Sequence, residues 1–121
     1  MEQGQIFKCP ICGNIIELLH VGGGQLVCCG VPMDLQKENT VDASLEKHVP
    51  VIEDKGGEWL IKIGAIPHPV EETHHIEWIE ANTTEGTCKK YLKPGEAAEM
   101  KLNEKVLSAR AYCNLHGLWK S

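Results

Sequence analysis

The sequence lacks the features that define several large classes of protein. Lys and Arg number 12 against 17 Asp and Glu, and the net charge of −5 leaves no basic excess for nucleic-acid phosphates. No apolar run approaches the roughly 18 residues of a membrane span. The first residues do not combine a basic stretch with the apolar stretch of a secretory signal. We therefore expect a cytoplasmic protein that binds neither nucleic acid nor membrane.

Aromatic residues are also scarce: the 121 residues include one Phe, two Tyr and three Trp. A short N-terminal piece of such a chain would struggle to bury a core, and domains below about 40 residues usually need a disulfide, a metal or a partner. The chain has instead six cysteines and six histidines. These residues are the first candidates for holding part of the fold together.

Four of the cysteines form two pairs near the N-terminus. Cys9 and Cys12 are two residues apart and precede Gly13, a pattern typical of a metal-binding knuckle. Cys28 and Cys29 are adjacent, so both can bind the same ion only if the tetrahedron is distorted. A reducing cytosol favours metal ligands over disulfides. Zinc and iron both accept four sulfur ligands, so the metal stays open at this point.

Short strand patterns separated by turns run through the whole chain. In the N-terminal part they cover residues 5–8, 14–19 and 25–27, and the polar stretch 32–44 is typical of a linker. Further strands are expected at 49–53, 59–63, 74–81, 87–92, 99–102 and 106–114. With no helical periodicity of useful length, we predict an all-β protein: a small metal-binding domain at 1–36 and an antiparallel β-sandwich at 37–121.

A second possible ligand set lies in the larger part. Alternation along 106–114 predicts that Leu107, Ala109, Ala111 and Cys113 share one apolar face, so that Cys113 points inward. His68 lies between two prolines, which stiffen its loop and lower the entropy lost on binding. The candidate ligands are His48, His68, His74, Cys113 and His116.

The adjacent residues His74 and His75 would face opposite sides of a strand. His74 shares its predicted side with Ile76 and Trp78, so we interpret His74 as the ligand and His75 as solvent-facing. Two other candidates stand alone in the sequence. His20 has no partner at ligand spacing, and Cys88 is expected to be a buried or half-buried residue without a metal.

Several longer motifs, in order along nearly the whole chain, resemble one known family. They are FKCPICGN, LVCCGVPM, EKHVPVIE, GAIPHPVEETHHIEWIE, LKPG and YCNLHGLWK. The chain resembles the desulfoferrodoxins, the two-iron superoxide reductases. The resemblance implies a rubredoxin-like first iron centre and a second iron in an immunoglobulin-like sandwich. The implied ligands are Cys9, Cys12, Cys28 and Cys29 for the first iron, and His48, His68, His74 and His116 with axial Cys113 for the second.

The resemblance also implies an activity: reduction of superoxide to hydrogen peroxide at an iron with an open sixth position. It implies a homodimer that rubredoxin or a similar donor re-reduces. Because the whole protein is negative, attraction of the superoxide anion has to be local, and Lys47 beside His48 is the natural source. The resemblance further suggests that the Glu46 carboxylate occupies the open position once the iron is ferric.

Three other functions compete with this interpretation. A four-cysteine zinc knuckle could stabilise a non-catalytic binding module, although five ligands exceed the tetrahedral preference of zinc. A superoxide dismutase would release dioxygen and need no electron donor. A simple one-electron carrier would use the four-cysteine iron alone, and would have no need of Glu46, Lys47 and His116.

Overall fold

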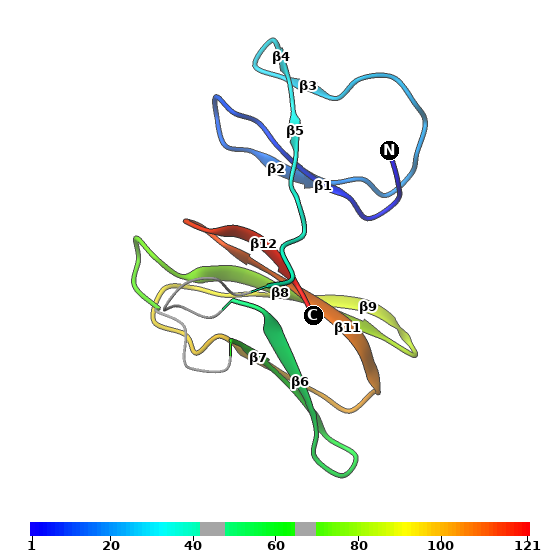
Figure 1. Ribbon diagram of the computed structural model, residues 1–121, viewed down its shortest axis with the longest axis vertical. Helices are drawn as coiled ribbons and strands as arrows, with labels where there is room; N and C mark the ends of the chain where they lie inside the picture. The colour runs from blue at the N-terminus through cyan, green and yellow to red at the C-terminus, as the bar shows by residue number, and fades with distance from the viewer. Residues whose placement is uncertain (42–47, 65–69) are drawn as a thin grey trace. The chain divides into compact units, whose positions relative to one another are not determined.

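A computed structural model describes residues 1–41, 48–64 and 70–121 (Figure 1). The chain divides into two compact units, Met1–Lys37 and Glu38–Ser121. The described residues of both units form strands, turns and loops but no helix, so the predicted all-β class is confirmed. It follows that the described part of the chain offers no helix suited to crossing a membrane.

The first unit consists of short strands around very few buried side chains. Its strands are β1 (Ile6–Lys8), β2 (Ile15–Glu17), β3 (Val27–Cys28), β4 (Val31–Pro32) and β5 (Asp34–Leu35). β1 lies between β2 and β5, and β3 pairs with β4. The buried apolar residues of this unit are Ile6, Phe7 and Cys9. Three side chains make a very small core, which agrees with the expectation that this unit needs another source of stability.

The segment 32–44, predicted as a linker, begins inside the first unit. β5 pairs with β1, where Phe7 lies opposite Leu35 and Lys8 opposite Asp34. A polar sequence is compatible with this position because β5 is an edge strand, with one side open to solvent. The prediction of a linker from residue 32 was therefore wrong for residues 32–35.

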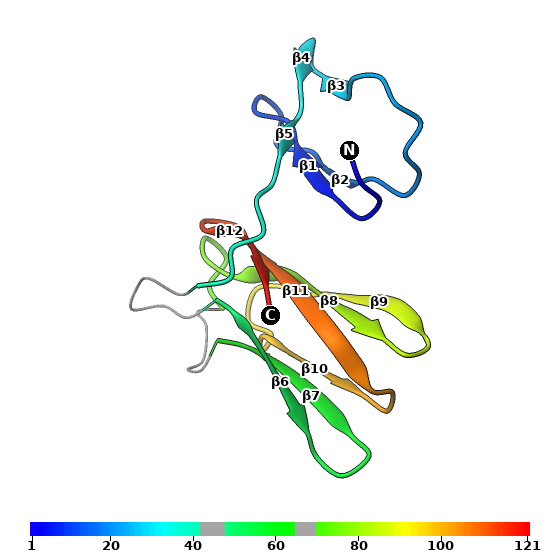
Figure 2. The same cartoon turned by 45° about the vertical axis from the view of Figure 1, so that its right-hand side comes forward.

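The second unit is a sandwich of two antiparallel sheets (Figure 2). Its strands are β6 (Pro50–Asp54), β7 (Trp59–Ile63), β8 (Ile76–Thr83), β9 (Gly86–Tyr91), β10 (Glu99–Leu102), β11 (Val106–Cys113) and β12 (Gly117–Lys120). One sheet has the order β10-β7-β6 and the other β12-β11-β8-β9. Residues of both sheets, including Ile61, Met100, Ile79 and Ala111, form one buried core. A division into three and four strands is typical of immunoglobulin-like sandwiches.

Two irregularities of the second sheet change which side chains face the core. Val106 lies opposite Thr83 and Ser108 opposite Asn82, so Leu107 is an extra residue, a β-bulge. Leu107 is therefore 60% exposed and does not share the core face, contrary to the predicted alternation. Beyond the bulge the prediction is confirmed, because Ala109, Ala111 and Cys113 are all buried in the core.

The second irregularity lies in β8, just beyond the two adjacent histidines. Tyr112 lies opposite Trp78, but its neighbour Cys113 lies opposite Ile76, so Glu77 is bulged. Ile76 is buried in the core, whereas Trp78 stacks on Tyr112 with ring centroids 4.7 Å apart. The predicted common side of Ile76 and Trp78 was wrong, because a bulge reverses the alternation.

Candidate metal centres

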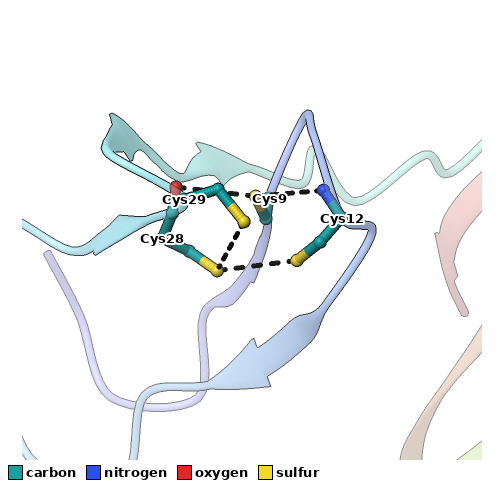
Figure 3. A group of neighbouring side chains, drawn as sticks. All are labelled: Cys9, Cys12, Cys28 and Cys29. Carbon is teal, nitrogen blue, oxygen red and sulfur yellow. Dashed lines mark hydrogen bonds between the residues drawn. The ribbon is translucent and has the colours of Figure 1, made fainter.

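The first unit brings its four cysteines together. The sulfur atoms of Cys9, Cys12, Cys28 and Cys29 all lie within 4.8 Å of one another and turn toward a common point (Figure 3). Cys12 Sγ is 3.6 Å from Cys28 Sγ, which is 4.0 Å from Cys29 Sγ. Two thiolates at a tetrahedral metal, each with a bond of about 2.3 Å, are about 3.8 Å apart. The spacing of these sulfurs fits a single zinc or iron ion.

Local backbone geometry explains how these cysteines converge. The backbone N–H groups of Ile11 and Cys12 both point at Cys9 Sγ, with N to S distances of 3.4 Å. Such hydrogen bonds stabilise negative charge on the sulfur. Cys29 has a φ of 53°, in the left-handed region that non-glycine residues rarely adopt. This conformation turns the chain between two adjacent cysteines, so that both can face the same point despite their spacing.

The thiols influence one another strongly. Hydrogen bonding from the Cys12 backbone N–H lowers the pKa of Cys9 to about 6. Hydrogen bonding to the Cys12 side chain raises the pKa of Cys28 to about 12, and the same partner raises the pKa of Cys29. Thiolates this close repel one another, so the four thiols do not all ionise readily. A cation bound between them offsets that repulsion. The chemistry of this donor set therefore also fits a bound metal ion.

The second unit assembles another group from three distant parts of the chain. His48 precedes β6, His74 precedes β8, Cys113 ends β11, and His116 lies in the turn before β12. Each of these four residues contributes one possible ligand atom, a ring nitrogen or the sulfur, and these four atoms all lie within 4.8 Å of one another. His116 Nδ1 is 3.1 Å from His48 Nε2 and 3.7 Å from Cys113 Sγ. Two imidazole nitrogens bound at right angles to one ion, at about 2.1 Å each, are about 3 Å apart.

Burial differs across this second group. Cys113 is fully buried and His48 is 1% exposed, whereas His116 is exposed at the surface. The sulfur therefore lies in the core, whereas the His116 residue is in contact with solvent.

Sequence reasoning missed two side chains that support this group. The Trp119 ring stacks on the His48 ring, with centroids 4.7 Å apart and planes 16° from parallel. Its indole Nε1–H donates a hydrogen bond to the carbonyl oxygen of His116 at 3.1 Å. Asn114 also hydrogen-bonds to the segment that carries His74. The available signal was their position in the sequence: Asn114 directly follows Cys113, and Trp119 lies three residues after His116.

Other candidate residues lie elsewhere or outside the described part. Glu46, Lys47 and His68 fall in the segments outside the described residues. His75, predicted to be solvent-facing, is half-buried. Cys88 is exposed, so its predicted burial was wrong. It lies on β9, an edge strand of its sheet whose residues are nearly all exposed.

Family models match both units separately. The model described as desulfoferrodoxin matches residues 40–121, and the one described as desulfoferrodoxin, N-terminal domain, matches residues 1–36. The chain belongs to the desulfoferrodoxin family. The four-cysteine group and the histidine–cysteine group are those expected of the two iron centres of a desulfoferrodoxin, in agreement with the predicted two iron ions per chain.

Individual relatives are similar over the full length. A desulfoferrodoxin of Nitratidesulfovibrio vulgaris is 53% identical over 122 residues, which cover 99% of this chain and 97% of the relative. A desulfoferrodoxin homolog of Archaeoglobus fulgidus is 52% identical over 122 residues, covering 99% and 98%. Among solved structures, the superoxide reductase of Treponema pallidum superposes with a TM-score of 0.78. It is 29% identical, and the match covers 97% of this chain and 96% of that one.

Proposed function

We propose that this desulfoferrodoxin is a superoxide reductase, which combines superoxide with one electron and two protons to give hydrogen peroxide. The observation that carries the proposal is the convergence of His48, His74, Cys113 and His116 on one point of the sandwich. The likeness to the Treponema pallidum superoxide reductase supports it. A one-electron carrier would need only the four-cysteine group, so a second group at an exposed edge favours catalysis.

The proposed ligands of the catalytic iron are His48, His68, His74, His116 and Cys113. A ferrous ion bound there would supply the electron. Cys113 holds its sulfur on the buried side, and the exposed His116 leaves the outer side accessible to a small anion. Five protein ligands leave one position for substrate, as catalytic metal sites require. In the first unit, Cys9, Cys12, Cys28 and Cys29 are the proposed ligands of the other iron.

Electrostatics favours an anion at this site despite the overall charge. The protein carries a net charge of −5, which repels superoxide at long range. Neutral imidazoles and one thiolate leave a ferrous site with a single positive charge. We assign Lys47 the role of adding positive charge beside this site, and Glu46 the role of a carboxylate that would bind a ferric ion there and so favour release of peroxide.

The activity is tested by product analysis. The iron-loaded protein, supplied with a chemical reductant, is exposed to a steady flux of superoxide while peroxide and dioxygen are measured. Superoxide reduction predicts peroxide without dioxygen in proportion to the reductant consumed, whereas dismutation releases dioxygen without using reductant. A Cys113→Ala variant is expected to lose the activity and keep the iron of the first unit. Dioxygen release, or equal activity in this variant, would refute the proposal.

The division of roles between Lys47 and Glu46 needs a faster measurement. Pulse radiolysis or stopped flow follows the reaction of reduced protein with superoxide. Lys47→Ala is expected to slow capture, with a weaker dependence on ionic strength than wild type, because it removes local attraction. Glu46→Ala is expected to leave capture unchanged. Equal slowing in both variants would contradict this division.

The remaining partners are proposed from the family. Rubredoxin, or a similar small one-electron donor, is the proposed reductant, and the chain is proposed to act as a homodimer. Anaerobic mixing with reduced rubredoxin tests the first: the oxidised protein should be reduced at a rate that rises with donor concentration. Light scattering tests the second, and a monomer mass would overturn it.

A further inference from the structure

The segment that carries His74 is held in place beyond the end of a β-ladder. The pairing of β8 with β11 ends at Ile76 and Cys113. Residues 73–75 lie beyond the end of this ladder, where His74 forms an isolated bridge with Glu71. His74 must nevertheless reach Cys113 and His116, because its ligand atom lies in the same group.

Asn114 joins this segment to the end of β11 through three hydrogen bonds. Its side-chain Oδ1 accepts from the His75 backbone N–H at 2.9 Å, and its Nδ2 donates to the Thr73 carbonyl oxygen, also at 2.9 Å. Its own backbone N–H donates to the His75 carbonyl oxygen at 3.2 Å. The two side-chain hydrogen bonds therefore hold the backbone on both sides of His74. Asn114, which forms them, directly follows Cys113 in the sequence.

We propose that Asn114 is the positioning residue of the second metal centre, fixing His74 at the correct distance from Cys113 and His116. The proposal rests on the proposed function only in assuming that this group binds a metal. A ligand held in advance loses less conformational entropy when the metal binds. The residues that orient metal ligands typically contribute about tenfold to a hundredfold in metal affinity.

The side chain of asparagine suits this role for a definite reason. A primary amide carries an acceptor and a donor that can point in the same direction, so one side chain can hydrogen-bond to a backbone N–H and a backbone carbonyl of the same segment. Aspartate has nearly the same shape but no donor, and its charge would face the Thr73 carbonyl oxygen. Leucine has a similar size and neither function. Asn114→Asp therefore removes the hydrogen bond to the Thr73 carbonyl, and Asn114→Leu removes both side-chain hydrogen bonds.

The chain contains a matched control for these substitutions. Asn82, also in the second unit, uses its amide in the same two ways: Nδ2 donates to Ser108 Oγ at 3.0 Å, and Oδ1 accepts from Thr87 Oγ1 at 2.7 Å. Asn82 pairs with Ser108 near the opposite end of β8 from the metal group. Asn82→Asp therefore makes the same chemical change without touching the segment that carries His74.

The experiment compares iron retention in full-length, iron-loaded proteins. Each variant is challenged anaerobically with increasing concentrations of a chelator, and iron per chain and the visible spectrum of each centre are followed. We expect both Asn114 variants to lose the iron of the second centre at about tenfold to a hundredfold lower chelator concentration than wild type. The first centre serves as an internal standard and should be unchanged. Asn82→Asp should match wild type at both centres.

A spectrum separates positioning from a general loosening of the sandwich. In Asn114→Ser, kept fully loaded by excess ferrous iron and then oxidised, the thiolate-to-iron absorption band of the second centre should shift, because His74 binds differently. Wild-type retention and an unshifted band, or an equal loss of iron in Asn82→Asp, would overturn the inference. No superoxide is used, so a protein that binds iron but fails to reduce superoxide would refute the proposed function alone.

Discussion

Replacing Glu80 should reveal a large buried electrostatic contribution to the stability of the sandwich. Its side chain is 3% exposed and forms two bonds with Arg110, Nε to Oε2 at 2.5 Å and Nη2 to Oε1 at 2.9 Å. Lys89 Nζ lies 2.6 Å from Oε1. Arg110 also contacts Glu38 at 3.3 Å. One buried carboxylate on β8 thus pairs with two cations, one on each of the flanking strands β11 and β9.

The expected loss of unfolding free energy follows from the two cations that Glu80→Gln leaves without this carboxylate. Burial raises the pKa of Glu80, but Arg110 and Lys89 outweigh burial and bring it down to about 2. Compared with the ordinary value of 4.5, this shift corresponds to about 3 kcal/mol of stabilisation at neutral pH. Removing one partner of a buried pair usually costs about 3–5 kcal/mol. Because Arg110 keeps Glu38, we expect Glu80→Gln to destabilise by about 3 kcal/mol.

Glu53 provides a matched control for this substitution. It also contacts two lysines, Lys62 at 3.2 Å and Lys55 at 3.3 Å, but its side chain is 32% exposed. Exposed ion pairs gain little because water and salt screen them. Glu53→Gln should therefore destabilise far less than Glu80→Gln, although both remove one carboxylate shared by two cations.

Urea unfolding of the iron-loaded proteins at pH 7 measures the difference. The three tryptophans, Trp59, Trp78 and Trp119, all lie in the second unit, so their fluorescence reports on the sandwich. Equal urea midpoints for Glu80→Gln and Glu53→Gln, or a wild-type midpoint for Glu80→Gln, would contradict a large contribution of Glu80 to stability. A lower urea midpoint, with an unchanged dependence of the unfolding free energy on urea concentration, would show that the substitution changes stability.

Three further predictions concern pH, an aromatic support and a thiol. The stability lost in Glu80→Gln should shrink as pH falls from about 5 to about 2, because protonation removes the wild-type advantage over that range. Trp119→Phe, which keeps a ring against His48 but loses the bond to the His116 carbonyl, should retain second-centre iron better than Trp119→Ala in a chelator challenge. In the iron-loaded protein a maleimide should label a single thiol, the exposed Cys88, because metal ligands are protected.

Each of these predictions has its own control. An unfolding difference between wild type and Glu80→Gln that stays constant down to pH 2 would contradict the assigned pKa. Equal iron retention in Trp119→Phe and Trp119→Ala would show that ring stacking on His48 contributes nothing. Labelling that persists in Cys88→Ser would mean that a ligand thiol is accessible.

The predicted elements agree with the structure where local pattern alone decides them. Residues 59–63 and 99–102 match β7 and β10, because each is a short run rich in apolar residues close to a strong turn signal. β12 (Gly117–Lys120) was not predicted as a strand, because its four residues carry too little pattern of their own and form a strand by pairing with β11. The predicted ligand role of His74 rested on an alternation that the Glu77 bulge removes, yet His74 does join the metal group. Asn114 hydrogen-bonds to the backbone on both sides of His74, a contact between distant residues that strand alternation cannot predict.

The sequence by itself determined the kinds of ligand, the spacing of the first cysteine pair and the membership of a family. Residue types and short spacings are local properties, and family membership adds up many local matches, so none of them depends on which strands pair. Only the tertiary structure decided that His48, His74 and Cys113 meet, that Leu107 faces solvent, that Trp119 stacks on His48, and that Asn114 hydrogen-bonds to the segment around His74. Contacts between residues far apart in the chain depend on strand register, and a bulge of one residue reverses which side chains face inward.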